Sequence, residues 1–125
     1  MKRVISTNYA PAAIGPYSQA IITGNMLFVS GQLGIDPATG DFVSGGVKEQ
    51  TEQVFKNINA ILKETGATLE NVVKTTVFLA DMADFSVMNE VYGKAFSAPY
   101  PARSAIAAKT LPKNGLVEIE VIAYL

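Results

Sequence analysis

VKEQTEQVFKNINAILKET, residues 47–65, carries apolar side chains at intervals of three and four residues. This spacing places them on one face of an α-helix. They are Val47, Val54, Phe55, Ile58, Ile61 and Leu62. Gly66 follows, and glycine easily adopts the left-handed conformation with which many helices end. We therefore predict an amphipathic helix from about Val47 to Thr65 whose apolar face is covered by a second layer.

Segments with a high content of strand-forming residues flank this helix. Val72 to Leu79 contains β-branched residues in close succession, which is typical of a buried strand. Before the helix, residues 17–23 and 26–30 are separated by Gly24-Asn25, a pair that suits a two-residue turn. We expect these two segments to form a hairpin.

A second helix is predicted to begin near Asp84, whose side chain can accept from free backbone N–H groups. Its apolar positions, at spacings of three and four, are Phe85, Met88, Tyr92 and Phe96. Tyr100-Pro101 ends the helical region, because the residue before a proline disfavours helical geometry. Two further strands are expected over about 102–108 and 116–124.

The order strands, helix, strand, helix, strands predicts an α+β fold, a two-layer sandwich with both helices on one face of a mixed sheet. No linker or repeat interrupts residues 1–125, so we expect one domain. In the last strand, residues alternate between Val117, directed under the helices, and Glu118, directed to the other face. That other face mixes carboxylates with apolar groups, and hydrophobic residues make up 49% of the sequence. We expect it to pack against another subunit.

The composition excludes several kinds of chemistry. The chain has no cysteine and no histidine, which excludes disulfides, thiolate metal sites, a cysteine nucleophile and the commonest general base. Neither a dinucleotide-binding nor a Walker motif occurs, and we expect no cofactor. The net charge of −1 indicates neither nucleic-acid nor anionic membrane partners. Without a long apolar run or a secretion signal at the N-terminus, we expect a cytoplasmic protein.

Arg103 is the first candidate functional residue. It begins a short strand of otherwise small and apolar residues, in the run PARSA at 101–105. Its planar guanidinium can hold a carboxylate through two hydrogen bonds, which a lysine cannot do. Two interpretations stay open: Arg103 binds an anionic ligand, or it forms a structural ion pair with Glu118 or Glu120 on the neighbouring strand.

Glu118 and Glu120 form the second candidate. They are two residues apart on a predicted strand and therefore share a face. Partial burial and mutual repulsion can raise the pKa of one carboxyl enough for acid-base catalysis. The pair is equally consistent with a solvated strand face, and the spacing does not distinguish the two glutamates.

Tyr17, Ser30, Gly31 and Asn89 are weaker candidates. Tyr17 follows a turn and either presents its hydroxyl to a pocket or packs with that hydroxyl in water. Ser30-Gly31 ends a strand, where glycine lets a backbone N–H approach a ligand or marks a bulge. Asn89 lies in the second helix as a ligand contact or a surface amide.

Several blocks of the sequence resemble the RidA family, also called the YjgF/UK114 family. They are IGPYSQA at 14–20, FVSGQLG at 28–34, KTTVFL at 74–79, MNEVY at 88–92, PARS at 101–104, LPK at 111–113 and VEIE at 117–120. The blocks occur in the family's order and span nearly the whole chain from Ile5 onward.

The resemblance implies a chorismate-mutase-like fold and a homotrimer whose sheets line a central barrel, with three active sites in clefts between subunits. It also implies an activity. Reactive 2-imino acids, 2-iminobutanoate and 2-iminopropanoate, are hydrolysed to 2-oxo acids and ammonia without a metal or an organic cofactor.

The resemblance further assigns roles by position. Arg103 would bind the substrate carboxylate, and Glu118 would hold the attacking water. The other positions that would line the pocket are Tyr17, Ser30, Gly31 and Asn89. Many members carry a cysteine two residues after the arginine, where this chain has Ala105, whose backbone N–H would still serve the carboxylate.

Two other classes of function are considered beside this one. An RNA-directed endoribonuclease or translation inhibitor is attributed to some relatives, but the chain has no basic cluster with interleaved aromatic residues. A non-catalytic module that binds 2-oxo acids, or a chaperone, would have the same pocket without turnover.

Overall fold

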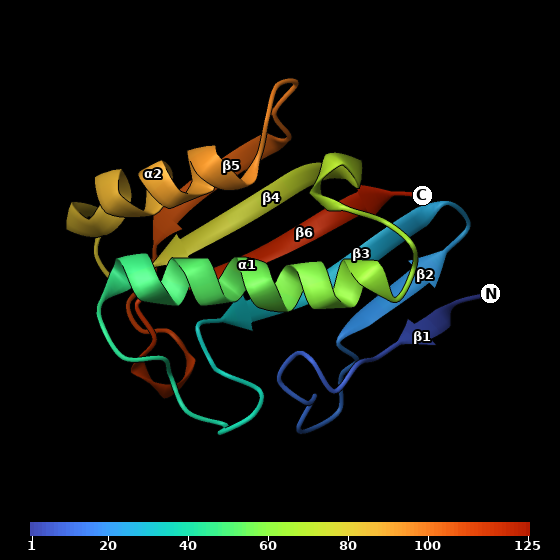
Figure 1. Ribbon diagram of the computed structural model, residues 1–125, viewed down its shortest axis with the longest axis horizontal. Helices are drawn as coiled ribbons and strands as arrows, with labels where there is room; N and C mark the ends of the chain where they lie inside the picture. Colours follow the sequence, from blue (N-terminus) through green and yellow to red (C-terminus); the bar gives the residue numbers. More distant parts are fainter.

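A computed structural model describes all of residues 1–125, with two α-helices on one face of a six-stranded sheet (Figure 1). The strands are β1 (Arg3–Ile5), β2 (Ala20–Thr23), β3 (Met26–Leu33), β4 (Val72–Leu79), β5 (Ala102–Ala107) and β6 (Val117–Tyr124). Their order in the sheet is β1-β2-β3-β6-β4-β5. The sheet is mixed because β5 is parallel to β4 while every other pair is antiparallel. The predicted α+β class with both helices on one face is confirmed.

Helix α1 (Val47–Lys63) begins where the apolar periodicity begins. At its start the Glu49 carboxylate accepts a hydrogen bond from the Gly46 N–H at 2.9 Å, and this bond is the main reason that the pKa of Glu49 is lowered. After its end, Gly66 has φ +77°, the left-handed conformation predicted for the stop. Neither α1 nor any other helix has the length and apolar character of a membrane span.

Helix α2 (Phe85–Ala95) starts differently from the prediction. The expected cap at Asp84 is wrong, because Asp84 has near-helical backbone angles (φ −87°, ψ 0°) and makes no capping bond with its side chain. Asp81 accepts a hydrogen bond from Ala83 N–H at 2.9 Å instead, at the beginning of a short 3₁₀ turn that leads into α2. The 3₁₀ turns are Leu69–Asn71, Met82–Asp84 and Pro112–Asn114.

The strands agree with the prediction within small shifts of their ends. β4 has the predicted bounds, and the Gly24-Asn25 turn joins β2 and β3 in the predicted hairpin. β1 has no counterpart among the predicted elements and pairs antiparallel with β2.

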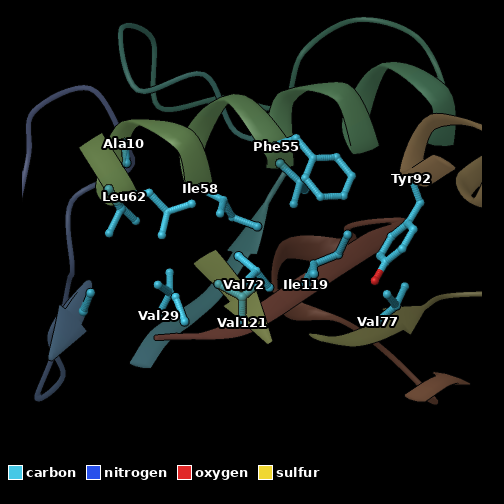
Figure 2. Packing of buried hydrophobic residues seen from close by; sticks show 14 of the residues in the cluster. Ala10, Val29, Phe55, Ile58, Leu62, Val72, Val77, Tyr92, Ile119 and Val121 are labelled. Carbon is cyan, nitrogen blue, oxygen red and sulfur yellow. The ribbon is translucent and has the colours of Figure 1, made fainter. Parts of the chain in front are cut away.

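A hydrophobic core of 22 buried residues fills the space between the helices and the sheet (Figure 2). Ile58 and Leu62 of α1 are fully buried, as is Ile119 of β6. Burial of each such side chain stabilises the fold by ~1.5–3 kcal/mol. Between α1 and α2, the Phe55 ring meets Tyr92 edge-on, with centroids 5.9 Å apart.

The strand register determines which residues share a face of the sheet. Buried Thr75 of β4, on the helix side, is paired with Arg103 of β5 and Val121 of β6. Phe78 of β4, on the other side, is paired with Glu118 of β6. Arg103 and Glu118 therefore lie on opposite faces of the sheet.

The face without helices, called here the open face, combines carboxylates with apolar side chains as predicted. Its large exposed apolar residues are Val4, Phe28, Ile106 and Tyr124, which are 43–60% exposed. Glu118 is half-buried among this set, and Glu120 is exposed. The packing of this face against another subunit stays a prediction.

Candidate functional site

Arg103 lies on three side chains of α2, and this arrangement is called here the Arg103 site. Its Nη1 donates a hydrogen bond to Asn89 Oδ1 at 2.7 Å. Its guanidinium carbon lies 4.6 Å from the centroid of the Tyr92 ring and 5.4 Å from that of Phe85. These contacts are to uncharged groups, so none of them is a counter-ion for the guanidinium, which has further N–H donors for an anion.

The structure excludes the ion pair considered for Arg103. The strand beside β5 is β4, and β6, which carries Glu118 and Glu120, is the next strand beyond it. Both glutamates also point to the open face, away from Arg103. Arg103 instead borders an open cavity of about 480 Å³ that Tyr100 and Asn89 also line. The ion pair is therefore wrong within one chain, and anion binding by Arg103 stays a prediction.

Ala105 lies two residues after Arg103 on the same strand and on the same face, because it pairs with buried Val77 of β4. It is half-buried. The role of its backbone N–H toward a carboxylate stays a prediction.

On the open face, the Glu118 side chain lies over Gly31. A Cβ added to Gly31 would lie 2.6 Å from Glu118 Oε2, so a larger residue at position 31 would displace the carboxylate. Gly31 lies in an irregularity of the β3–β6 pairing between Val29 and Gln32. Burial raises the pKa of Glu118, and the negative charge of Glu120 raises it further.

Ser30 precedes Gly31 in β3, and Tyr17 lines one cavity with Ser30 and Glu120 and another with Gly31. Ser30 Oγ donates to the carbonyl of Ser18 at 2.6 Å, so the hydroxyl has lone pairs but no hydrogen left to offer a ligand. Tyr17 is 54% exposed. It borders a cavity of about 500 Å³ with Ser30, and a second of about 480 Å³ with Gly31. Glu118, Gly31, Ser30 and Tyr17 are called here the Glu118 site.

The predicted site residues thus form two groups. Asn89 joins Arg103, whereas Gly31 lies against Glu118, and Tyr17 lines cavities with Ser30 and with Gly31. The hypothesis of a single site is not met within one chain, because the sheet separates the two groups.

Tyr92 and Gln19 are site-forming residues that the sequence predictions do not include. Tyr92 was expected only as a core residue, but it lies three residues after Asn89, a spacing that puts both on one face of α2. Gln19 is buried, and its Nε2 donates to the carbonyls of Thr7 and Pro11, which holds the N-terminal loop beside Tyr17. A glutamine between a turn and a strand carries no spacing signal for this role.

No cluster of three or more metal-binding side chains occurs in the chain. The candidate ligand-binding groups are a guanidinium on one face of the sheet and a half-buried carboxylate on the other. Fold and sites define a small α+β protein with two candidate sites on opposite faces of one sheet.

Comparison with known proteins identifies the family. The family described as Endoribonuclease L-PSP matches residues 7–125. The chain belongs to this family, the RidA (YjgF/UK114) family whose sequence blocks it shares.

Individual relatives are similar over almost the whole chain. Reactive Intermediate Deaminase A, chloroplastic, of Arabidopsis thaliana is 57% identical over 124 residues, which are 99% of this chain and 66% of that protein. The 2-iminobutanoate/2-iminopropanoate deaminase of Capra hircus is 54% identical over 98% of this chain and 90% of its own. The crystal structure of RidA from Psychrobacter sp. PAMC 21119 superposes with a TM-score of 0.94 at 51% identity, covering 98% of this chain and 99% of its own.

Proposed function

We propose that this protein hydrolyses 2-imino acids to 2-oxo acids and ammonia, in an active site that forms where two copies meet. The observation that carries the proposal is the placement of Arg103 and Glu118 on opposite faces of one sheet. A carboxylate clamp and a base that serve one small substrate must be a few ångströms from it. Arg103 of one copy therefore faces Glu118 of the next. Relatives named as deaminases of 2-imino acids support the choice of substrate.

This arrangement requires a contact between two different surfaces, the β5 edge of one copy and the β3–β6 region of another. Repetition of such a contact gives a closed ring when the rotation between neighbouring copies closes, as a three-fold rotation does. The family resemblance implies a ring of three. The exposed apolar residues of the open face, including Phe28 and Tyr124, would be covered in the ring.

Substrate binding begins at the Arg103 site. The guanidinium binds the carboxylate of the 2-imino acid through two hydrogen bonds, while Asn89 holds its Nη1 and the Ala105 N–H supplies a further donor. The clamp fixes C2, the reacting carbon, relative to the Glu118 site. An encounter in solution becomes a positioned attack.

Glu118 then transfers protons. Its ionised carboxylate takes a proton from a water molecule as the water oxygen bonds to C2 of the iminium, giving a carbinolamine. Glu118 returns this proton to the nitrogen, accepts the hydroxyl proton as the C2–N bond breaks, and passes that proton to the departing ammonia, which leaves as ammonium and restores the carboxylate. The products are the 2-oxo acid and ammonium. A raised pKa suits a group that must both accept and donate protons near neutral pH.

The other residues of the Glu118 site shape the pocket. Gly31 leaves room for the Glu118 carboxylate. Ser30, whose hydrogen is donated to Ser18, would accept a hydrogen bond from the iminium nitrogen. Tyr17 forms the outer wall.

Coupled turnover tests the proposal. A threonine dehydratase generates 2-iminobutanoate, and semicarbazide trapping reports how fast the imine disappears when this protein is added. We expect acceleration by wild type, and a loss of about 10²-fold or more in Arg103→Ala because the clamp is gone. Arg3→Ala is the matched control, since Arg3 is an exposed arginine on the opposite edge strand, β1.

Absence of acceleration would contradict the enzyme proposal. If wild type then binds 2-oxobutanoate with the same dependence on Arg103, the protein is a binding module. Salt-dependent cleavage of RNA that survives Arg103→Ala would instead favour the activity in the family's description.

A further inference from the structure

We propose that Tyr92, anchored by Thr75, is a positioning residue that orients Arg103 before a carboxylate binds. The inference rests on the proposed function, since it gives the clamp a support that the assigned site residues do not include. Tyr92 touches Arg103 rather than the substrate, and Thr75 acts through Tyr92.

Tyr92 reaches from α2 toward the sheet, and its hydroxyl points to the strands (Figure 2). The Tyr92 hydroxyl and Thr75 Oγ1 share a hydrogen bond of 2.8 Å, and both residues are buried. The Phe96 ring packs against the Tyr92 ring with centroids 4.7 Å apart, and Phe55 meets it edge-on. The ring is therefore fixed at its hydroxyl end and along its sides.

The guanidinium of Arg103 lies over this ring, with its carbon 4.6 Å from the ring centroid. Thr75 is also the residue of β4 that pairs with Arg103 in the sheet. Thr75 therefore holds the Tyr92 ring through its hydroxyl and also lies beside the backbone of Arg103. A tilt of the ring would move the guanidinium relative to its own strand.

The arrangement matters because an arginine side chain has many rotamers. A flexible arginine loses this freedom when it binds a carboxylate, which weakens binding. Arg103 is exposed on an edge strand, where nothing from β5 itself restrains it. The Tyr92 ring and Asn89 order it in advance, and neither neutralises its charge.

Two conservative variants test the role. Tyr92→Phe keeps the ring and removes the hydroxyl, while Thr75→Val keeps the shape and removes the partner. We expect each to raise the Kd for 2-oxobutanoate, measured by calorimetry, and the KM for the imine by about fivefold, with kcat within about twofold. The double variant should be no weaker than either single one, because one hydrogen bond is lost in all three.

The matched control is Thr51→Val. Thr51 is fully buried in α1, and its hydroxyl donates to the Val47 carbonyl at 2.6 Å, far from Arg103 in the chain. The Thr51→Val variant loses a comparable internal hydrogen bond, so its stability should fall while its Kd for 2-oxobutanoate stays at the wild-type value. An equal Kd change in Thr51→Val, or independent addition of the two effects in the double variant, would overturn the positioning role.

A second measurement separates this inference from the proposed function. The chain has two arginines, Arg3 and Arg103, so their side-chain Nε–H signals are readily told apart by ¹⁵N NMR. We expect the Arg103 signal to report an ordered side chain in the assembled protein, and Tyr92→Leu to make it mobile while Arg3 is unchanged. An Arg103 signal as mobile as that of Arg3 in wild type would refute the inference whether or not 2-oxobutanoate binds. Failure to bind 2-oxobutanoate with an ordered Arg103 would refute the proposed function alone.

Discussion

The Arg103 site and the Glu118 site differ in how the surroundings act on the charge of the central side chain. Around Arg103 the contacts are an amide and two aromatic rings, which hold the cation without neutralising it. Around Glu118, burial and the neighbouring Glu120 oppose the charged form and raise the pKa. The contacts of Arg103 thus hold its guanidinium in place, whereas the surroundings of Glu118 disfavour the ionised carboxylate, so that this group takes up a proton more readily.

This difference corresponds to the division of labour in the proposed reaction. A clamp must be rigid and charged throughout the cycle, whereas a base must take up and release protons within each cycle. One chain keeps the two on separate faces. Assembly would be the event that makes the chemistry possible.

The largest expected effect at the Glu118 site comes from Glu118→Gln. Turnover should fall by about 10²-fold or more because the amide cannot take a proton from water. Binding of 2-oxobutanoate should change little, since the carboxylate clamp is intact. Glu70→Gln, at an exposed glutamate, is the control. Equal losses of binding in Glu118→Gln and Arg103→Ala would abolish the distinction between the two regions.

Glu118→Gln, which should lower turnover, should raise the stability of the fold at alkaline pH. Because the folded-state pKa of Glu118 is raised above its unfolded value, its protonated form favours the fold, and this contribution is lost as pH rises through the folded pKa. Glu118→Gln should therefore unfold at a higher temperature than wild type at about pH 8. The advantage should vanish near pH 4, where the carboxyl is largely protonated in both states. Thermal unfolding at both values measures this, and a less stable variant at pH 8 would contradict it.

Gly31→Ala should have an intermediate effect. The added Cβ would lie 2.6 Å from Glu118 Oε2, and the end of this flexible side chain can move away. We expect kcat to fall by about tenfold with little change in stability, as the carboxylate loses its position rather than its chemistry. Gly46→Ala, where a Cβ has no neighbour within 4 Å, serves as the control. An unchanged kcat would mean that the placement of Glu118 over Gly31 is unimportant.

Glu120→Gln should have the smallest effect. Burial is the main cause of the raised pKa of Glu118, and the charge of Glu120 is the second. Without that charge the pKa falls, so the acidic limb of the kcat profile should move to lower pH by less than about one unit. A shift to higher pH would show that Glu120 does not act through its charge.

The sequence predicts the elements of this fold better than it predicts their neighbours. The apolar periodicity from Val47 locates the start of α1, and the β-branched run from Val72 to Leu79 locates β4 within its observed bounds. Both signals are local. The predicted cap at Asp84 is wrong because the chain enters α2 through a 3₁₀ turn. The residue type at one position does not indicate such a turn.

The candidate site shows the same limit. Arg103 and Glu118 are recognisable from residue type and family blocks, and the common face of Glu118 and Glu120 follows from alternation. The separation of Arg103 from both depends on β4 lying between β5 and β6, which is long-range information. The role of Tyr92 depends on which helix covers which strand, so it emerges only with the fold.

Subunit complementation tests the central claim that one active site needs two copies. Arg103→Ala and Glu118→Gln chains, each inactive alone, are unfolded, mixed in equal amounts and refolded together. Random assembly pairs an intact Arg103 with an intact Glu118 at about a quarter of the interfaces, so the mixture should recover about a quarter of the wild-type turnover. A mixture that forms the same oligomer and stays inactive would contradict the account, because it would place both residues of each site on one chain.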